Sequence, residues 1–175
     1  MINTKISTAT KALFISSALA VTTMASAALP TQWQLDDSHT RVGFSVSHLG
    51  FSTTMGHFSD VEGMVNYDMK APNQTSMNFT IATDSIDTNW DARDKHLKTD
   101  EFFNVAKYPT MTFKSTQVKF INPQQAKVTG DFTLLGQTKP LTLDVTLNKI
   151  ANSPLTKKPV VGFRATGTLD RAAYG

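Results

Sequence analysis

Leu141-Thr142-Leu143-Asp144-Val145-Thr146-Leu147 is the stretch that decides the fold of this 175-residue chain. Leucine or valine occupies every second position, and threonine or aspartate occupies the positions between them. Because successive side chains of a β-strand point to opposite faces of a sheet, this pattern predicts a strand with one apolar and one hydrated face. The Leu135-Gly136-Gln137 turn precedes it and joins it to a second alternating run, residues 126–134.

The same two-residue period recurs along most of the chain. Further alternating runs cover residues 42–48, 61–69, 77–81, 111–113, 118–120 and 161–169, and turn residues such as Asn122-Pro123-Gln124 separate them. Seven or eight antiparallel strands at this spacing predict a sandwich or a barrel, and closure into a barrel is the usual way to hide sheet edges. The predicted class is therefore all-β, an antiparallel barrel of about eight strands.

The N-terminal residues predict a secretory signal peptide over residues 1–27. Lys5 and Lys11 precede an apolar run, residues 12–21, and Ala25-Ser26-Ala27 has the small-x-small pattern of a cleavage site. The run is too short for the roughly 20 residues of a membrane-spanning helix, so we expect export without a stable membrane span. The mature domain would be residues 28–175.

Charge and cysteine content narrow the function further. The formal net charge of +3 falls by two when Lys5 and Lys11 are removed, and no Lys/Arg cluster of nucleic-acid-binding size remains. The chain has no cysteine, so its stability must come from burial rather than disulfides.

Residues 85–115 interrupt the alternation with a charged segment. A short helix is predicted from Trp90 to Lys98, capped by Asp87 or Thr88, with acidic residues early and lysines late, as the helix dipole favours. The simplest arrangement is a helical excursion that caps one end of the barrel.

No catalytic or metal-binding constellation is apparent. His39, His48 and His57 are nine residues apart, which is not the spacing of a zinc site, and neither a Gly-x-Ser-x-Gly elbow nor a glycine-rich phosphate loop occurs. Adjacent helix positions diverge, so Arg93 and Asp94 should not share a face, whereas Arg93 and His96 can. That pair would either pin the helix to the rim or contact a ligand head group. A non-enzymatic protein is predicted.

His48 shares strand parity with Val42, Phe44 and Val46, so we expect it to point inward, either in a structural hydrogen bond or against the polar end of a ligand. The inward methionines and phenylalanines either fill a core or line a pocket, since an eight-stranded barrel can do both. The residues themselves leave these two alternatives open.

Several segments, in this order, resemble the YceI-like family of bacterial periplasmic proteins. They are Trp33-Gln34-Leu35-Asp36, residues 42–50, Gly56-His57-Phe58, the 85–115 segment with Arg93-Asp94 and Tyr108-Pro109, residues 130–141, and residues 171–175. The resemblance covers essentially the whole mature chain.

The resemblance implies a lipocalin-like barrel whose apolar tunnel holds a long isoprenoid lipid, such as a polyprenyl carrier or an isoprenoid quinone. The protein would be a periplasmic carrier in transport, storage or stress response, without a separate cofactor or metal. Expected ligand-binding residues are Val42, Phe44, Val46, His48, Val65, Tyr67, Met77, Phe79, Ile81, Trp90, Arg93, Leu97, Phe102, Phe103, Met111, Phe113, Phe132, Leu134, Leu143, Val145, Phe163 and Ala165. The alternatives are an enzyme acting on an amphiphilic lipid through Arg93, His96 or His48, and a barrel with no ligand that serves protein partners.

Family members typically continue past the Arg-x-x-Tyr/Phe-Gly segment into a final strand, whereas this sequence ends at Gly175. We therefore expect either an incomplete chain or a barrel that lacks one edge strand. An open edge would favour pairing with a second copy as a homodimer.

Overall fold

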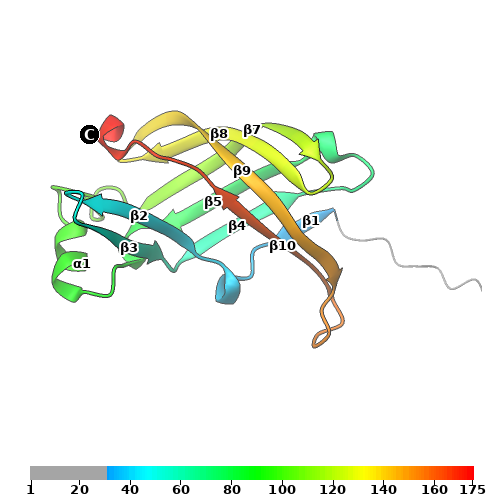
Figure 1. Cartoon of the computed structure of the whole chain (residues 1–175), viewed down its shortest axis with the longest axis horizontal. Helices are drawn as coiled ribbons and strands as arrows, with labels where there is room; N and C mark the ends of the chain where they lie inside the picture. The colour runs from blue at the N-terminus through cyan, green and yellow to red at the C-terminus, as the bar shows by residue number, and fades with distance from the viewer. Residues whose placement is uncertain (1–30) are drawn as a thin grey trace, which may run out of the picture.

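The computed structural model describes residues 31–175, and the predicted signal peptide lies outside this range. Figure 1 shows the arrangement of the elements. The strands are β1 (Gln32–Gln34), β2 (Val42–His48), β3 (Ser52–Phe58), β4 (Val61–Asn66), β5 (Ser76–Ala82), β6 (Ile86–Asp87), β7 (Thr110–Asn122), β8 (Gln125–Leu134), β9 (Gln137–Asn152) and β10 (Pro159–Thr166). One α-helix, α1 (Asp91–Leu97), and four 3-10 helices, η1 (Asp37–His39), η2 (Pro72–Gln74), η3 (Thr83–Ser85) and η4 (Arg171–Tyr174), complete the described chain.

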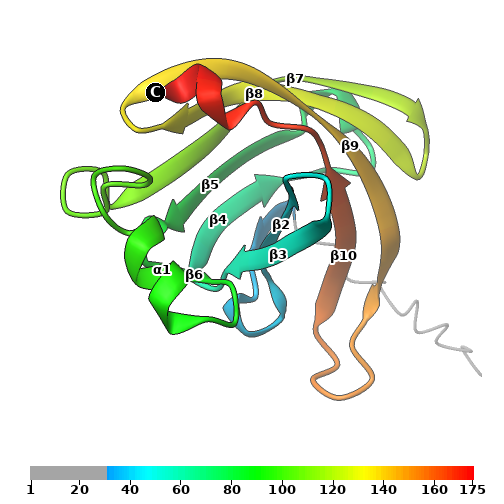
Figure 2. The ribbon, with the colours of Figure 1, turned by 60° about the vertical axis from the view of Figure 1, so that its left-hand side comes forward.

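The strands form two antiparallel sheets that together make a nearly closed barrel (Figure 2). The larger sheet has the order β1-β4-β5-β7-β8-β9-β10, and the smaller has the order β2-β3-β6. In the described chain β10 pairs only with β9, and β2 pairs only with β3. The predicted all-β barrel is confirmed, and its eight strands of six or more residues match the expected number.

Two tight turns set the register of neighbouring strands. Leu135 and Gly136 join β8 to β9 with φ angles of 51° and 72°, and Leu49 and Gly50 join β2 to β3 with φ angles of 54° and 80°. Positive φ at both central residues matches the twist of a two-residue hairpin, and glycine adopts that conformation without steric cost. The predicted turn at residues 135–137 is therefore confirmed.

The interior of the barrel has two unlike sides. On β4, β5, β7 and β8, which we call the packed wall, most inward side chains are almost fully buried, although Phe79, Val118 and Phe120 are only half-buried. The buried side chains include Val61, Val65, Met77, Ile81, Met111, Phe113, Val128, Phe132 and Leu134. On β9 and β10, which we call the open wall, the inward side chains Leu141, Leu143, Val145, Leu147, Val161 and Phe163 are only half-buried.

Residues 88–109, which we call the cap segment, lie at the end of the barrel where β7 begins (Figure 2). Thr83 fixes this segment to η3, because its backbone N–H donates to Pro109 O at 2.9 Å and its hydroxyl to Tyr108 O at 2.7 Å. The predicted helix is confirmed over Asp91–Leu97, but its predicted capping by Asp87 or Thr88 is wrong. Trp90 is the N-cap residue and makes no side-chain cap hydrogen bond.

Candidate ligand pocket

An apolar pocket lies where β7 turns into β8. Figure 1 shows that this turn lies at the end of the barrel opposite the cap segment. The empty volume of this pocket is about 530 Å³, part of which is open to solvent. It is lined by Val65, Tyr67, Thr75, Met77, Val118, Phe120, Pro123, Gln124, Gln125, Ala126, Val145, Leu147, Val161 and Phe163. The pocket therefore lies between the ends of β4, β5, β7 and β8 on one side and the open wall on the other.

Among residues 31–175, no charged residue lines this pocket. Its polar lining residues are Tyr67, Thr75, Gln124 and Gln125. The Thr75 hydroxyl donates to Pro72 O at 2.6 Å, and Gln125 Oε1 accepts from Asn122 Nδ2 at 2.9 Å. A second, more polar hollow adjoins the same turn and is lined by residues 122–125 and Thr146. The arrangement offers an apolar chamber with a neutral, hydrogen-bonding rim.

Five of the predicted ligand-binding residues line this pocket: Val65, Tyr67, Met77, Val145 and Phe163. Seven others, Phe79, Ile81, Met111, Phe113, Phe132, Leu134 and Leu143, lie deeper in the barrel as part of the core or packed against it. Five inward residues were missing from the prediction: Val118, Phe120, Ala126, Leu147 and Val161. The two-residue alternation of the sequence already placed these five residues on the inner face. Their nearness to the 122–124 turn is the signal that could have identified them as pocket residues.

Aromatic rings pack against one another at the cap end of the barrel. The ring centroids of Phe44 and Phe58 lie 5.8 Å apart, and those of Phe58 and Phe103 lie 5.5 Å apart in an edge-to-face arrangement. Val42 and Leu97 also pack against this core. These four predicted ligand-binding residues, Val42, Phe44, Leu97 and Phe103, are thus packed at the end away from the pocket.

Arg93 holds the start of the cap segment together. Its Nε donates to Thr88 Oγ1 and its Nη2 to Thr88 O, both at 2.7 Å, and its guanidinium lies 5.3 Å from the centroid of the Trp90 ring. The Asp94 carboxylate accepts from Thr88 N at 3.0 Å and from the Thr88 hydroxyl. Arg93 and Asp94 therefore meet at Thr88, and the expectation that they diverge is wrong because both side chains reach back past the helix N-terminus.

His96 is also engaged within the cap segment. Its Nε2 lies 2.7 Å from Glu101 Oε2, and its ring packs edge-on against Phe102 with the centroids 4.9 Å apart. Arg171 connects this region to η4, since its guanidinium donates to Phe102 O and Gly175 O. Burial raises the pKa of Tyr174, the last residue of η4, whose ring packs on Phe132.

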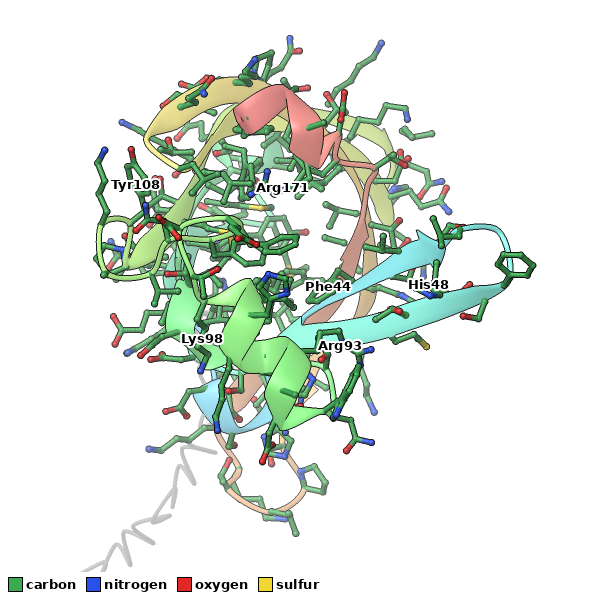
Figure 3. The ribbon with its side chains drawn as sticks, turned by 90° about the vertical axis from the view of Figure 1, so that its left-hand side faces the viewer. Phe44, His48, Arg93, Lys98, Tyr108 and Arg171 are labelled. Atoms are coloured by element: carbon green, nitrogen blue, oxygen red, sulfur yellow. The ribbon has the colours of Figure 1, made fainter. Side chains whose placement is uncertain are left out.

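Four predicted ligand-binding residues are exposed instead: Val46, His48, Trp90 and Ala165. The expectation that His48 points into the barrel is wrong, because the tip of the β2–β3 hairpin extends beyond the barrel, as Figure 3 shows. Val46 is 57% exposed although Phe44, two residues earlier, packs against the core. The position of a residue in the alternation predicts on which face of the sheet its side chain lies. Burial of that side chain also requires another part of the protein to pack against the same face.

Asp36, Ser38 and His39 contain the residue types of a hydrolase triad but not its geometry. The Asp36 carboxylate accepts from the Ser38 hydroxyl at 2.6 Å, and the same ring nitrogen of His39, Nδ1, lies 2.9 Å from Asp36 and 2.8 Å from Ser38. These hydrogen bonds lower the pKa of Asp36. A triad instead uses the two ring nitrogens for different partners, so this exposed group is a local turn network.

Among residues 31–175, no three His, Cys, Asp or Glu residues come together in a way that could hold a metal ion. No helix of the described chain has the length and hydropathy needed to cross a membrane.

Fold and pocket together define a β-barrel with an apolar end chamber. The chain belongs to the YceI-like family, because the model of the YceI-like domain matches residues 33–175. It is 40% identical over 156 residues to Protein YceI of Salmonella arizonae, covering 89% of this chain and 81% of the relative. It is 38% identical over 161 residues to a UPF0312 protein of Pectobacterium carotovorum, covering 91% and 83%.

Solved structures agree with this assignment. The YCEI protein of Campylobacter jejuni is similar with a TM-score of 0.65 and 32% identity, covering 81% of this chain and 82% of that one. BcnA of Burkholderia cenocepacia has the same fold, with a TM-score of 0.71 at 23% identity and coverage of 79% and 82%.

Proposed function

We propose that this protein binds and carries a long isoprenoid lipid, with its chain in the apolar end pocket. The observation that carries the proposal is the pocket itself, which in the described part of the chain is lined mainly by aliphatic and aromatic side chains and by no charged residue. Membership of the YceI-like family favours an isoprenoid, either a polyprenyl carrier or a quinone, over other lipids.

The driving force would be burial of apolar surface. Each Å² of apolar surface that is removed from water contributes about 25 cal/mol to the free energy of binding. A prenyl chain covered by the open wall would therefore gain affinity from hydrocarbon contact alone. The half-buried Leu147, Val161 and Phe163 would become covered by the same event. Binding rather than turnover is the proposed activity, because Arg93 and His96 are hydrogen-bonded inside the cap segment.

Export to the periplasm is part of the proposal and is supported by the sequence of residues 1–27. A carrier there would move, store or protect a lipid between membranes. The unpaired outer edges of β2 and β10 also favour association with a second copy, which light scattering of the purified protein would detect.

The test is organic-solvent extraction of protein purified from its native periplasm without detergent, followed by mass spectrometry. The expected result is one isoprenoid species in near-stoichiometric amount. Val145→Glu, which places a charge in the pocket, should remove it, whereas Thr142→Glu, on the outer face of the same strand, should not. An empty extract from folded wild-type protein, or full retention by folded Val145→Glu, would refute the proposal.

A further inference from the structure

We propose that the pocket end of the barrel docks on the surface of an anionic lipid bilayer. The docking surface consists of three segments that we call the mouth loops: the β4–β5 connection (residues 67–75), the β7–β8 turn with the strand ends beside it (residues 121–125) and the β9–β10 connection (residues 153–158). Their strands pair in the antiparallel order β4-β5-β7-β8-β9-β10, so all three lie at one end of the sheet. Figure 1 shows that this is the end away from α1.

Each mouth loop exposes one large apolar side chain. Met69 is 57% exposed, Ile121 is 60% exposed and Leu155 is 89% exposed. Single exposed apolar residues are ordinary, but a set of them around the mouth of an apolar pocket is typical of a surface that meets a protein or a membrane. Shallow insertion among lipid acyl chains would remove all three side chains from water, which is favourable in proportion to the area covered.

Lysines accompany these apolar side chains, outside the pocket lining. They are Lys70, Lys157 and Lys158 in the mouth loops, and Lys119 and Lys149 on the adjoining parts of β7 and β9. All five are exposed, and none forms an ion pair with a described residue. Asp68 is the one acidic residue of the mouth loops, and its carboxylate accepts from the Lys70 backbone N–H at 2.8 Å. The surface is therefore positively charged, as a surface that binds anionic lipid head groups must be.

The cap end has the opposite balance of charge. Residues 84–101, from η3 into the cap segment, contain six acidic and three basic side chains. The β2–β3 hairpin at that end also exposes an apolar side chain, Phe51, which is 89% exposed, but residues 42–58 contain no lysine or arginine. Near an anionic bilayer, this asymmetry would turn the mouth loops toward the membrane and the cap segment away from it. Exposed apolar side chains and unpaired lysines thus coincide at the pocket end.

Docking in this orientation would bring the pocket mouth against the bilayer. A lipid could then pass between membrane and pocket without exposing its whole chain to water, a step whose cost rises with the apolar area exposed. The inference goes beyond the proposed function and does not depend on it, because the mouth loops lie on the surface whether or not the pocket holds a lipid. Vesicle binding by the delipidated protein can therefore be tested separately from lipid recovery by extraction.

The experiment is co-sedimentation of the purified, delipidated protein with large unilamellar vesicles. One set is pure phosphatidylcholine, and the other contains about 30% phosphatidylglycerol, which gives the surface a negative potential. We expect at least about tenfold tighter binding to the anionic vesicles at low ionic strength, and a smaller ratio when salt screens the lysines. Equal binding to both vesicles, or binding to neither, would overturn the inference and leave the proposed function standing.

A pair of double variants tests the lysines. Lys70→Gln with Lys158→Gln removes two exposed cations from the mouth loops, and we expect it to weaken binding to the anionic vesicles about tenfold. Lys95→Gln with Lys107→Gln removes two exposed cations from the cap segment, and we expect a change of less than about twofold, because these side chains face away from the docked membrane. Equal losses would show that net charge, not the mouth loops, sets the binding, and would overturn the inference.

A second pair tests the apolar contribution. Leu155→Ser and Phe51→Ser each remove an apolar side chain that is 89% exposed, so both variants should fold. We expect Leu155→Ser to weaken vesicle binding about fivefold and Phe51→Ser to leave it unchanged. Equal effects of the two variants would overturn the inference. So would a Leu155→Ser protein that binds vesicles as the wild type does; light scattering that shows loss of a dimer in that variant would then assign the surface to contact with a second copy.

Discussion

β8 and β9 are neighbouring strands with equally regular alternation, yet their inward side chains differ in burial. On β8, Val128 is 0% and Leu134 is 1% exposed, whereas Leu143 and Leu147 on β9 are only half-buried. The two strands are hydrogen-bonded in continuous register from Gln125↔Thr146 to Leu134↔Gln137, so backbone geometry does not explain the difference. The difference lies in what packs against the inner face of each strand.

The packed wall meets other side chains over most of its inner face and borders the pocket only near the β7–β8 turn, whereas the open wall borders the pocket through Val145, Leu147, Val161 and Phe163. Phe132 on β8 is covered by Tyr174 with 5.9 Å between ring centroids, and Phe113 on β7 lies 6.4 Å from Phe79 on β5. Val145 and Leu147 on β9 line the empty end chamber instead. Stability should therefore depend mainly on the first wall and ligand binding mainly on the second, a division of roles that mutations can test.

The largest expected effect is from Leu134→Ala in the packed wall. Removal of a leucine side chain that is 1% exposed leaves a cavity, and we expect a loss of about 3 kcal/mol in the free energy of unfolding. The measurement is urea denaturation of the cargo-free protein. Leu147→Ala is the matched control in the open wall, and a loss as large as that of Leu134→Ala would contradict the division.

A smaller difference is expected between two glycines. A Cβ at Gly130 on β8 would lie 2.5 Å from Phe113 Cζ and 2.6 Å from Lys114 O, whereas one at Gly162 on β10 would lie 4.0 Å from its nearest atom, Lys149 O. We expect Gly130→Ala to lower the free energy of unfolding by about 2 kcal/mol, because the backbone oxygen cannot move aside easily. Gly162→Ala should change it by less than about 0.5 kcal/mol. Thermal and urea unfolding would measure both, and equal losses would mean that β10 is as tightly packed as β8.

Leu147→Ala should act mainly on the cargo. Its side chain is half-buried and lines the pocket, so we expect a loss of about 1 kcal/mol in the free energy of unfolding, well below that of a fully buried leucine. The amount of lipid recovered by solvent extraction should fall severalfold. A Leu147→Ala protein that retains its lipid fully would show that the chamber is not where the tail lies.

Much of the fold follows from local patterns in the sequence. The strands on either side of Leu135-Gly136 were predictable because alternation and turn chemistry are local, and both agree with the structure. The cap helix was also predictable, but its capping was not. Thr88 uses its hydroxyl and backbone N–H on Asp94 rather than acting as the N-cap residue, an arrangement that depends on where the chain enters from β6.

The position of the pocket could not be read from the same patterns. Alternation assigns Phe113 and Val145 to the inner face alike, although one is in the core and the other faces empty space. Which end of the barrel is filled depends on contacts distant in sequence, such as Phe58 with Phe103. His48 shows the same limit, since its parity is inward but its side chain is exposed on a hairpin that extends beyond the barrel (Figure 3).

The smallest expected effect concerns the outer faces of β8 and β9. There the packed wall and the open wall should not differ in how much a side chain contributes to stability. Lys127 on β8 and Asp144 on β9 form an ion pair at 2.7 Å, and their side chains are 53% and 64% exposed. An exposed pair gains little in high dielectric, so a double-mutant cycle of Lys127→Gln and Asp144→Asn should give a coupling energy below about 0.5 kcal/mol at physiological salt. Because the pair lies outside the barrel, neither change should alter lipid recovery. A coupling above about 1 kcal/mol would mean that this cross-strand contact, and not interior packing alone, holds the open wall to the packed wall.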